Sequence, residues 1–78
     1  MIKIKVLGPG CNNCVRLAAN AHKAIEILGI DAVVEKVTDY NEIHKYPILA
    51  TPGLVINDKL VAAGRIPDAA EIVAWLKI

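Results

Sequence analysis

The spacing of the apolar residues changes abruptly at Gly8-Pro9-Gly10. In residues 2–7 isoleucine and valine alternate with lysine, which is the two-residue period of a β-strand. Beyond the glycines the apolar positions recur at intervals of four and three, as on one face of a helix: Cys14, Ala18, Ala21, Ile25 and Leu28. Gly29 then supplies a left-handed residue that ends the helix. A strand that runs directly into a helix points to an α/β fold.

The rest of the chain extends this pattern. Residues 32–37 are rich in valine and predict a second strand, so the first helix becomes a right-handed crossover between parallel strands. A short helix is predicted over 40–45, because Asp39 and Glu42 have capping-box spacing and Pro47 follows.

The C-terminal part predicts a hairpin and a last helix. Residues 54–56 and 59–63 read as two strands around Asn57-Asp58, whose residue types tolerate positive φ. Pro67 is expected at a first helical position, and one face of the closing helix is apolar: Ala69, Ile72, Val73 and Leu76. The expected order of elements is βαβαββα.

Size and charge narrow the possible functions. The chain has 78 residues, enough for one domain over 1–78. Its formal charge is +1 and it has no basic cluster, so nucleic acid and anionic membranes are not expected as partners. The longest uncharged stretch, 46–57, has twelve residues, against the ~20 that a membrane helix needs. The first residues resemble no targeting signal, and we therefore expect a cytoplasmic protein.

Cys11-Asn12-Asn13-Cys14 stands where the first strand gives way to the first helix. The unpaired N–H groups and about half a positive charge at a helix N-terminus favour a thiolate over a thiol. Cys11 is therefore the expected nucleophile. Cys14 belongs to the apolar stripe, so it should be shielded, and one helical turn brings its sulfur back within disulfide reach.

This arrangement predicts thiol–disulfide exchange, in which Cys11 attacks a disulfide and Cys14 resolves the mixed disulfide. Binding of a soft metal by the two thiolates is the main alternative, because small heavy-metal-associated domains also place a Cys-x-x-Cys between a first strand and a first helix. Their order of elements is βαββαβ, however, and Pro9 stands where their loop usually carries Met. The two histidines, His22 and His44, are expected at the surface, so no metal ligands are assigned.

Thr51-Pro52-Gly53 precedes the hairpin and completes a pattern that resembles small thioredoxin-like or glutaredoxin-like proteins. The resemblance covers nearly the whole chain: Gly10 and the cysteine turn match the active-site turn, Thr51-Pro52 the cis-proline, and Gly64 the glycine after the last strand. It implies a mixed four-stranded sheet of order 2-1-3-4 with three helices, the short one on its own face. It also implies that the Thr51 backbone holds substrate as an added strand and that Pro52 lies beside the sulfurs.

The chain departs from the thioredoxin motif, because Gly10 replaces Trp and Asn12-Asn13 replace Gly-Pro. These uncharged residues favour a reductase-like over an oxidant-like potential. No nucleotide-binding motif is present, so we expect no cofactor, protein disulfides as substrates, recycling by a separate enzyme of the thioredoxin-reductase type, and a monomer. Glutathione binding is unsupported. A soft-metal-binding module and an inactive thioredoxin-like interaction domain remain the alternative functions.

Overall fold

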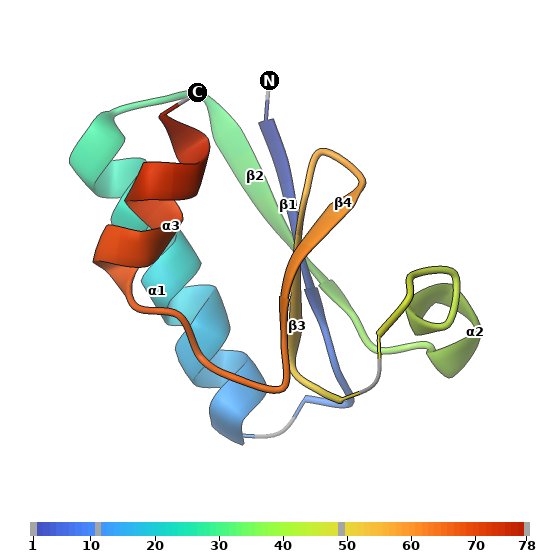
Figure 1. Ribbon diagram of the computed structural model, residues 1–78. Helices are drawn as coiled ribbons and strands as arrows, with labels where there is room; N and C mark the ends of the chain where they lie inside the picture. The colour runs from blue at the N-terminus through green and yellow to red at the C-terminus, as the bar shows by residue number, and fades with distance from the viewer. Residues whose placement is uncertain (1, 11, 49, 78) are drawn as a thin grey trace.

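The computed structural model describes residues 2–10, 12–48 and 50–77. Four strands and three helices follow one another in the predicted order, βαβαββα (Figure 1). Their bounds are β1 Ile2–Leu7, α1 Asn12–Leu28, β2 Ala32–Val37, α2 Tyr40–Ile43, β3 Gly53–Ile56, β4 Lys59–Ala63 and α3 Ala69–Leu76.

The strands form one mixed sheet of order β2-β1-β3-β4, as predicted. β1 runs parallel to β2, with Leu7 opposite Val37, and antiparallel to β3, with Leu7 opposite Gly53. β3 and β4 form the expected hairpin. Its turn residues Asn57 and Asp58 have φ of 49° and 67°, the left-handed conformation for which their short polar side chains are suited.

Helices cover both faces of the sheet. Figure 1 shows α1 and α3 side by side on one face and α2 on the other. The larger core lies under α1 and α3 and is aliphatic apart from a cysteine: Ile4, Val6, Cys14, Leu17, Ala18, Ala21, Ala24, Leu54, Ala62, Ile72 and Leu76. A smaller cluster of Leu7, Ile43 and Val55 lies under α2. The resulting two-sided packing is the expected one.

The buried stripe of α1 is broader than the sequence pattern indicated. Leu17 and Ala24 are fully buried, whereas Ile25 and Leu28 are only partly buried. The cause is α3, which packs along α1 and covers a second side of it. The end of α1 is as predicted, since Gly29 has a φ of 61° and its N–H donates to the Ile25 carbonyl.

Two helix starts differ in detail from the prediction. α3 begins two residues after Pro67, because Asp68 is the N-cap and its Oδ1 accepts the Glu71 N–H at 2.9 Å. α2 ends at Ile43, short of the expected residue 45. Asp39 caps it through the Asn41 N–H at 2.9 Å, so the predicted reciprocal capping box is not made.

None of the described helices is long and apolar enough to cross a membrane.

Candidate functional site

Three segments meet at the end of the sheet where β1 finishes. Beyond β1, the Gly8 N–H donates to the Val37 carbonyl at 2.9 Å, which extends the pairing with β2. Gly10 then turns the chain with a φ of 88°, a conformation that glycine adopts without steric cost. The helix α1 starts at Asn12. The predicted nucleophile, Cys11, lies outside the described residues.

Cys14 occupies the first turn of α1 and points into the larger core. Only 5% of its surface is exposed, as expected for the shielded member of the pair. Gly8 lies directly against its sulfur: a Cβ atom on residue 8 would overlap Cys14 Sγ and would stand 3.9 Å from Pro52 Cα. Gly8 therefore lets the strand end, the cysteine and the proline come together.

The Thr51–Pro52 peptide bond is cis, which confirms the prediction. Pro52 is buried, and Thr51 next to it is exposed. The Pro52 carbonyl accepts the Gly64 N–H at 2.9 Å, and Gly64 has a φ of 73°. A Cβ on Gly64 would stand 2.9 Å from Ala50 Cβ, so glycine is needed there for both reasons. The predicted glycine after the last strand thus packs against the proline loop.

A small cavity of about 80 Å³ opens beside Cys14. Its other described lining residues are Val6, Gly8, Gly10, Val15, Lys36 and Thr38. Lys36 and Thr38 were not among the predicted site residues. Parallel pairing places Lys36 opposite Val6, so the ends of β1 and β2 share one edge of the sheet. The sequence could have indicated these residues, because the predicted crossover makes β1 and β2 parallel, and parallel strands end at the same edge of a sheet.

The surface around the cysteine turn is nearly uncharged. Asn12 and Asn13 are exposed, as is Val15 on the same turn, and the cation of Arg16 lies a turn further along α1. Among the described residues that line the cavity, Lys36 carries the one formal charge. A substrate segment would thus meet small, polar and apolar groups there.

Several polar and aromatic side chains lie outside the site. His22 and His44 are exposed, and within the described ranges no three His, Cys, Asp or Glu side chains gather as a metal site would require. Trp75 is half-buried on α3, with Arg65 5.7 Å from the centre of its ring. Lys5 Nζ lies 3.4 Å from the Tyr46 hydroxyl and 3.9 Å from Asp58 Oδ1.

The sequence matches a known family over nearly its full length. The family model described as thioredoxin domain covers residues 2–77. The chain belongs to the thioredoxin family. It is 44% identical over 77 residues to a thioredoxin of Methanocaldococcus jannaschii, covering 99% of this chain and 88% of that protein. It is 40% identical over 72 residues to a thioredoxin of Methanothermobacter thermautotrophicus, covering 92% and 94%.

A solved structure supports the thioredoxin fold independently. Thioredoxin-2, described as a component of the malaria parasite's protein secretion machinery, superposes with a TM-score of 0.74 over 99% of this chain and 82% of that one. The two sequences are 14% identical, so this likeness concerns the fold. Membership of the thioredoxin family implies thiol–disulfide oxidoreductase chemistry.

Proposed function

We propose that the protein reduces protein disulfides through Cys11 and Cys14 and is recycled by a separate reductase. The observation that carries the proposal is the position of Cys14, which is buried in the first turn of α1 with Gly8 directly against its sulfur. A shielded sulfur at this position suits a resolving cysteine, because it is withheld from solvent yet lies one helical turn from residue 11.

The exchange proceeds in two steps. The Cys11 thiolate attacks one sulfur of the substrate disulfide, forming a mixed disulfide, and the other substrate sulfur leaves as a thiolate that takes a proton. The Cys14 thiolate then attacks Cys11 Sγ and displaces the second substrate thiolate. Two electrons pass to the substrate, and the protein is left with a Cys11–Cys14 disulfide. A reductase of the thioredoxin-reductase type returns the two electrons.

Substrate would bind beside the proline loop. The exposed Thr51 offers backbone N–H and C=O groups to an extended substrate segment, while Pro52, which has no N–H, packs near the sulfur. Gly10, Asn12 and Asn13 form the other side of the contact surface and present no large side chain to an approaching chain. This supports access by folded protein disulfides.

The test is insulin-disulfide reduction with dithiothreitol, run on the wild type and on Cys11→Ser, Cys14→Ser and Lys23→Gln. We expect both cysteine variants to lose activity and the control Lys23→Gln, an exposed position on α1 away from the cysteine turn, to keep it. With insulin alone and no dithiothreitol present, Cys14→Ser should accumulate a mixed disulfide on a non-reducing gel, because Cys11 still attacks but cannot be released internally. Trapping by Cys11→Ser instead would reverse the two roles.

Metal analysis of the reduced protein separates the alternatives. One equivalent of a soft metal per chain together with no insulin reduction would favour a metal-binding module. Neither metal nor insulin reduction would favour an inactive interaction domain. Either result would reject the proposed oxidoreductase function.

A further inference from the structure

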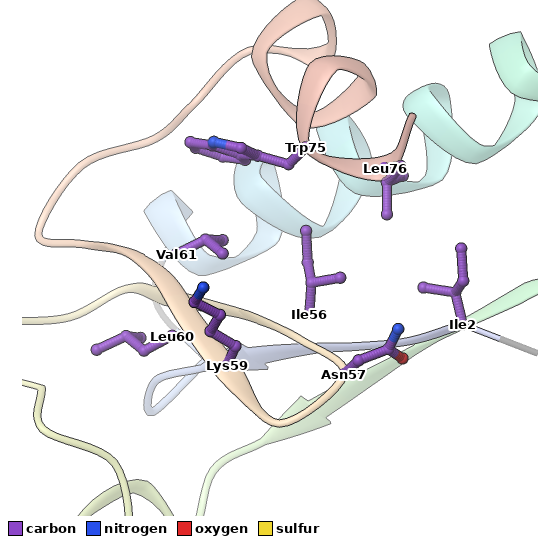
Figure 2. A pocket seen from close by; sticks show the side chains of 8 residues that line it. All are labelled: Ile2, Ile56, Asn57, Lys59, Leu60, Val61, Trp75 and Leu76. Carbon is purple, nitrogen blue, oxygen red and sulfur yellow. The ribbon is translucent and has the colours of Figure 1, made fainter. Parts of the chain in front are cut away.

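A groove of about 600 Å³ lies between the β3–β4 hairpin and α3. Figure 2 shows the side chains that line it: Ile2, Ile56, Asn57, Lys59, Leu60, Val61, Trp75 and Leu76. Ile2 opens β1, whereas the cysteine turn follows the other end of that strand. The groove is therefore separate from the redox site, and the mechanism proposed above makes no use of it.

The groove exists because of the way in which α3 packs. This helix of eight residues lies along α1 and covers the sheet face of the hairpin only in part (Figure 1). Ile56 and Val61 on that face are consequently only partly buried, as is Trp75 on the facing side of α3. Partly buried aliphatic and indole groups that face one another form the apolar walls typical of a small-molecule site.

Two polar side chains of the groove come from the hairpin, and both offer donors: in Figure 2 the Lys59 ammonium group lies beside Val61, whereas the Asn57 amide lies toward Ile2. Asn57 Oδ1 already accepts the Lys3 N–H at 3.0 Å, which leaves its amide NH₂ as a donor. The Lys59 side chain extends from β4 on the side of the groove (Figure 2), and no ion pair among the described residues involves it. A cation beside an apolar wall matches a carboxylate with an apolar tail.

The charged side chains near the groove leave Lys59 available to an anion. The acid of the turn, Asp58, lies 3.9 Å from Lys5 Nζ, and no described lining residue of the groove is acidic. Arg65, near Trp75, pairs with Glu71 at 2.9 Å. Lys59 is thus the cation that remains for an incoming anion among the described residues of the groove.

We propose that this groove binds amphipathic carboxylates with a single apolar chain. The carboxylate would lie at Lys59, and the chain would run between Ile56 and Val61 on one side and Trp75 on the other. A second copy of the protein fits less well. A two-fold contact uses the same patch on both partners, so it would bring two Lys59 ammonium groups together without an acid from the described lining to offset them.

Trp75 makes the proposal directly testable, because it is the one tryptophan of the chain and it lines the groove. The full-length reduced protein is titrated with octanoate, which is ionised at pH 7. We expect a saturable change in tryptophan emission. Octan-1-ol, which has the same chain without the charge, should bind about tenfold more weakly.

Two lysine variants test whether Lys59 is the group that binds the octanoate carboxylate. Lys59→Gln should weaken octanoate binding about tenfold and leave octanol binding unchanged, whereas Lys23→Gln, an exposed position on α1, should bind both like the wild type. Amide shifts of Asn57 and Lys59 and of the Trp75 indole N–H should move with the same saturation. Insulin reduction should be unaffected by Lys59→Gln.

Several results would overturn the proposal. They are no emission change with octanoate, equal affinity for octanoate and octanol, equal effects of the two lysine variants, or amide shifts centred on the cysteine turn. Tryptophan emission that depends on protein concentration without octanoate would assign the groove to self-association instead. None of these results bears on the redox function, which is tested by the insulin assay alone.

Discussion

Gly8 and Cys14 are so close that a side chain on residue 8 would occupy the place of the Cys14 sulfur. The end of the first strand and the first turn of the first helix are thereby held in contact at the redox site, with Pro52 against the same glycine. Any side chain at this position must displace the sulfur, the backbone of β1 or the proline loop.

Gly8→Ala is therefore expected to lower the free energy of unfolding by about 1–3 kcal/mol, the usual cost of overpacking a filled core. Disulfide reduction should also slow, because the displaced sulfur is the proposed resolving group. Urea unfolding of the reduced protein and the insulin assay measure the two effects. Lys23→Ala, at an exposed position on α1, is the control and should stay within about 0.5 kcal/mol of the wild type. Wild-type stability of Gly8→Ala would contradict the close contact.

Iodoacetamide at neutral pH should modify Cys11 well before Cys14 in the folded, reduced protein. Cys14 has 5% of its surface exposed, and residue 11 stands just before α1, where the helix N-terminus favours a thiolate. Peptide mass mapping after short labelling times measures the two rates. In concentrated urea the difference should largely disappear, since burial and the helix are both lost. Faster labelling of Cys14 in the folded protein would contradict the assigned roles.

Gly64→Ala should destabilise the protein more than Gly29→Ala. Both glycines have positive φ, so alanine costs roughly 1–2 kcal/mol at either position. At Gly29 a Cβ would meet nothing within 4 Å, whereas at Gly64 it would stand 2.9 Å from Ala50 Cβ. The excess loss at Gly64, measured by urea unfolding, reports this crowding beside the proline loop. Equal losses of stability in the two variants would show that the proline loop moves aside for the added methyl group without a cost in free energy.

Stability should depend on Lys5 at alkaline pH. The hydrogen bond to Tyr46 is the largest cause that raises the pKa of Lys5 above its ordinary value of 10.5, with Asp58 and Glu35 adding to it. Because the folded-state pKa is raised, the stabilisation is complete below the unfolded value and is lost as the pH rises through the folded one. The difference in unfolding free energy between the wild type and Lys5→Met should therefore be constant up to about pH 9.5 and shrink above it. A difference that grows with pH would contradict the raised pKa.

Much of this fold follows from local patterns in the sequence. The bounds of β1, β2 and β4 and the end of α1 agree with the prediction, because each is marked by a change of period or by a glycine or turn pair. The cis bond at Pro52 was expected from the resemblance together with its place before the hairpin. These features need no knowledge of which elements pack together.

The structure differs from the prediction where contacts between separate elements or side chains determine which residues are buried, capped or brought into the site. Leu17 and Ala24 are buried because α3 lies along α1, which no local pattern of α1 reveals. Glu42 does not complete the capping box, since its carboxylate pairs with Lys45 at 3.1 Å. Lys36 reaches the cavity beside Cys14 through the long-range register of two parallel strands. Each of these depends on a partner distant in sequence or on competition between neighbouring side chains.

The two inner strands of the sheet are also the two that lead into the redox site. β1 runs into Gly8, and β3 begins immediately after Pro52, while β2 and β4 form the outer edges. Inner strands are the last parts of a domain to open in native-state hydrogen exchange, whereas edges and short helices fray at lower free energy. Brief opening of α2 can therefore occur without separating the strand end, the resolving cysteine and the proline, so the redox site would persist through such local fluctuations.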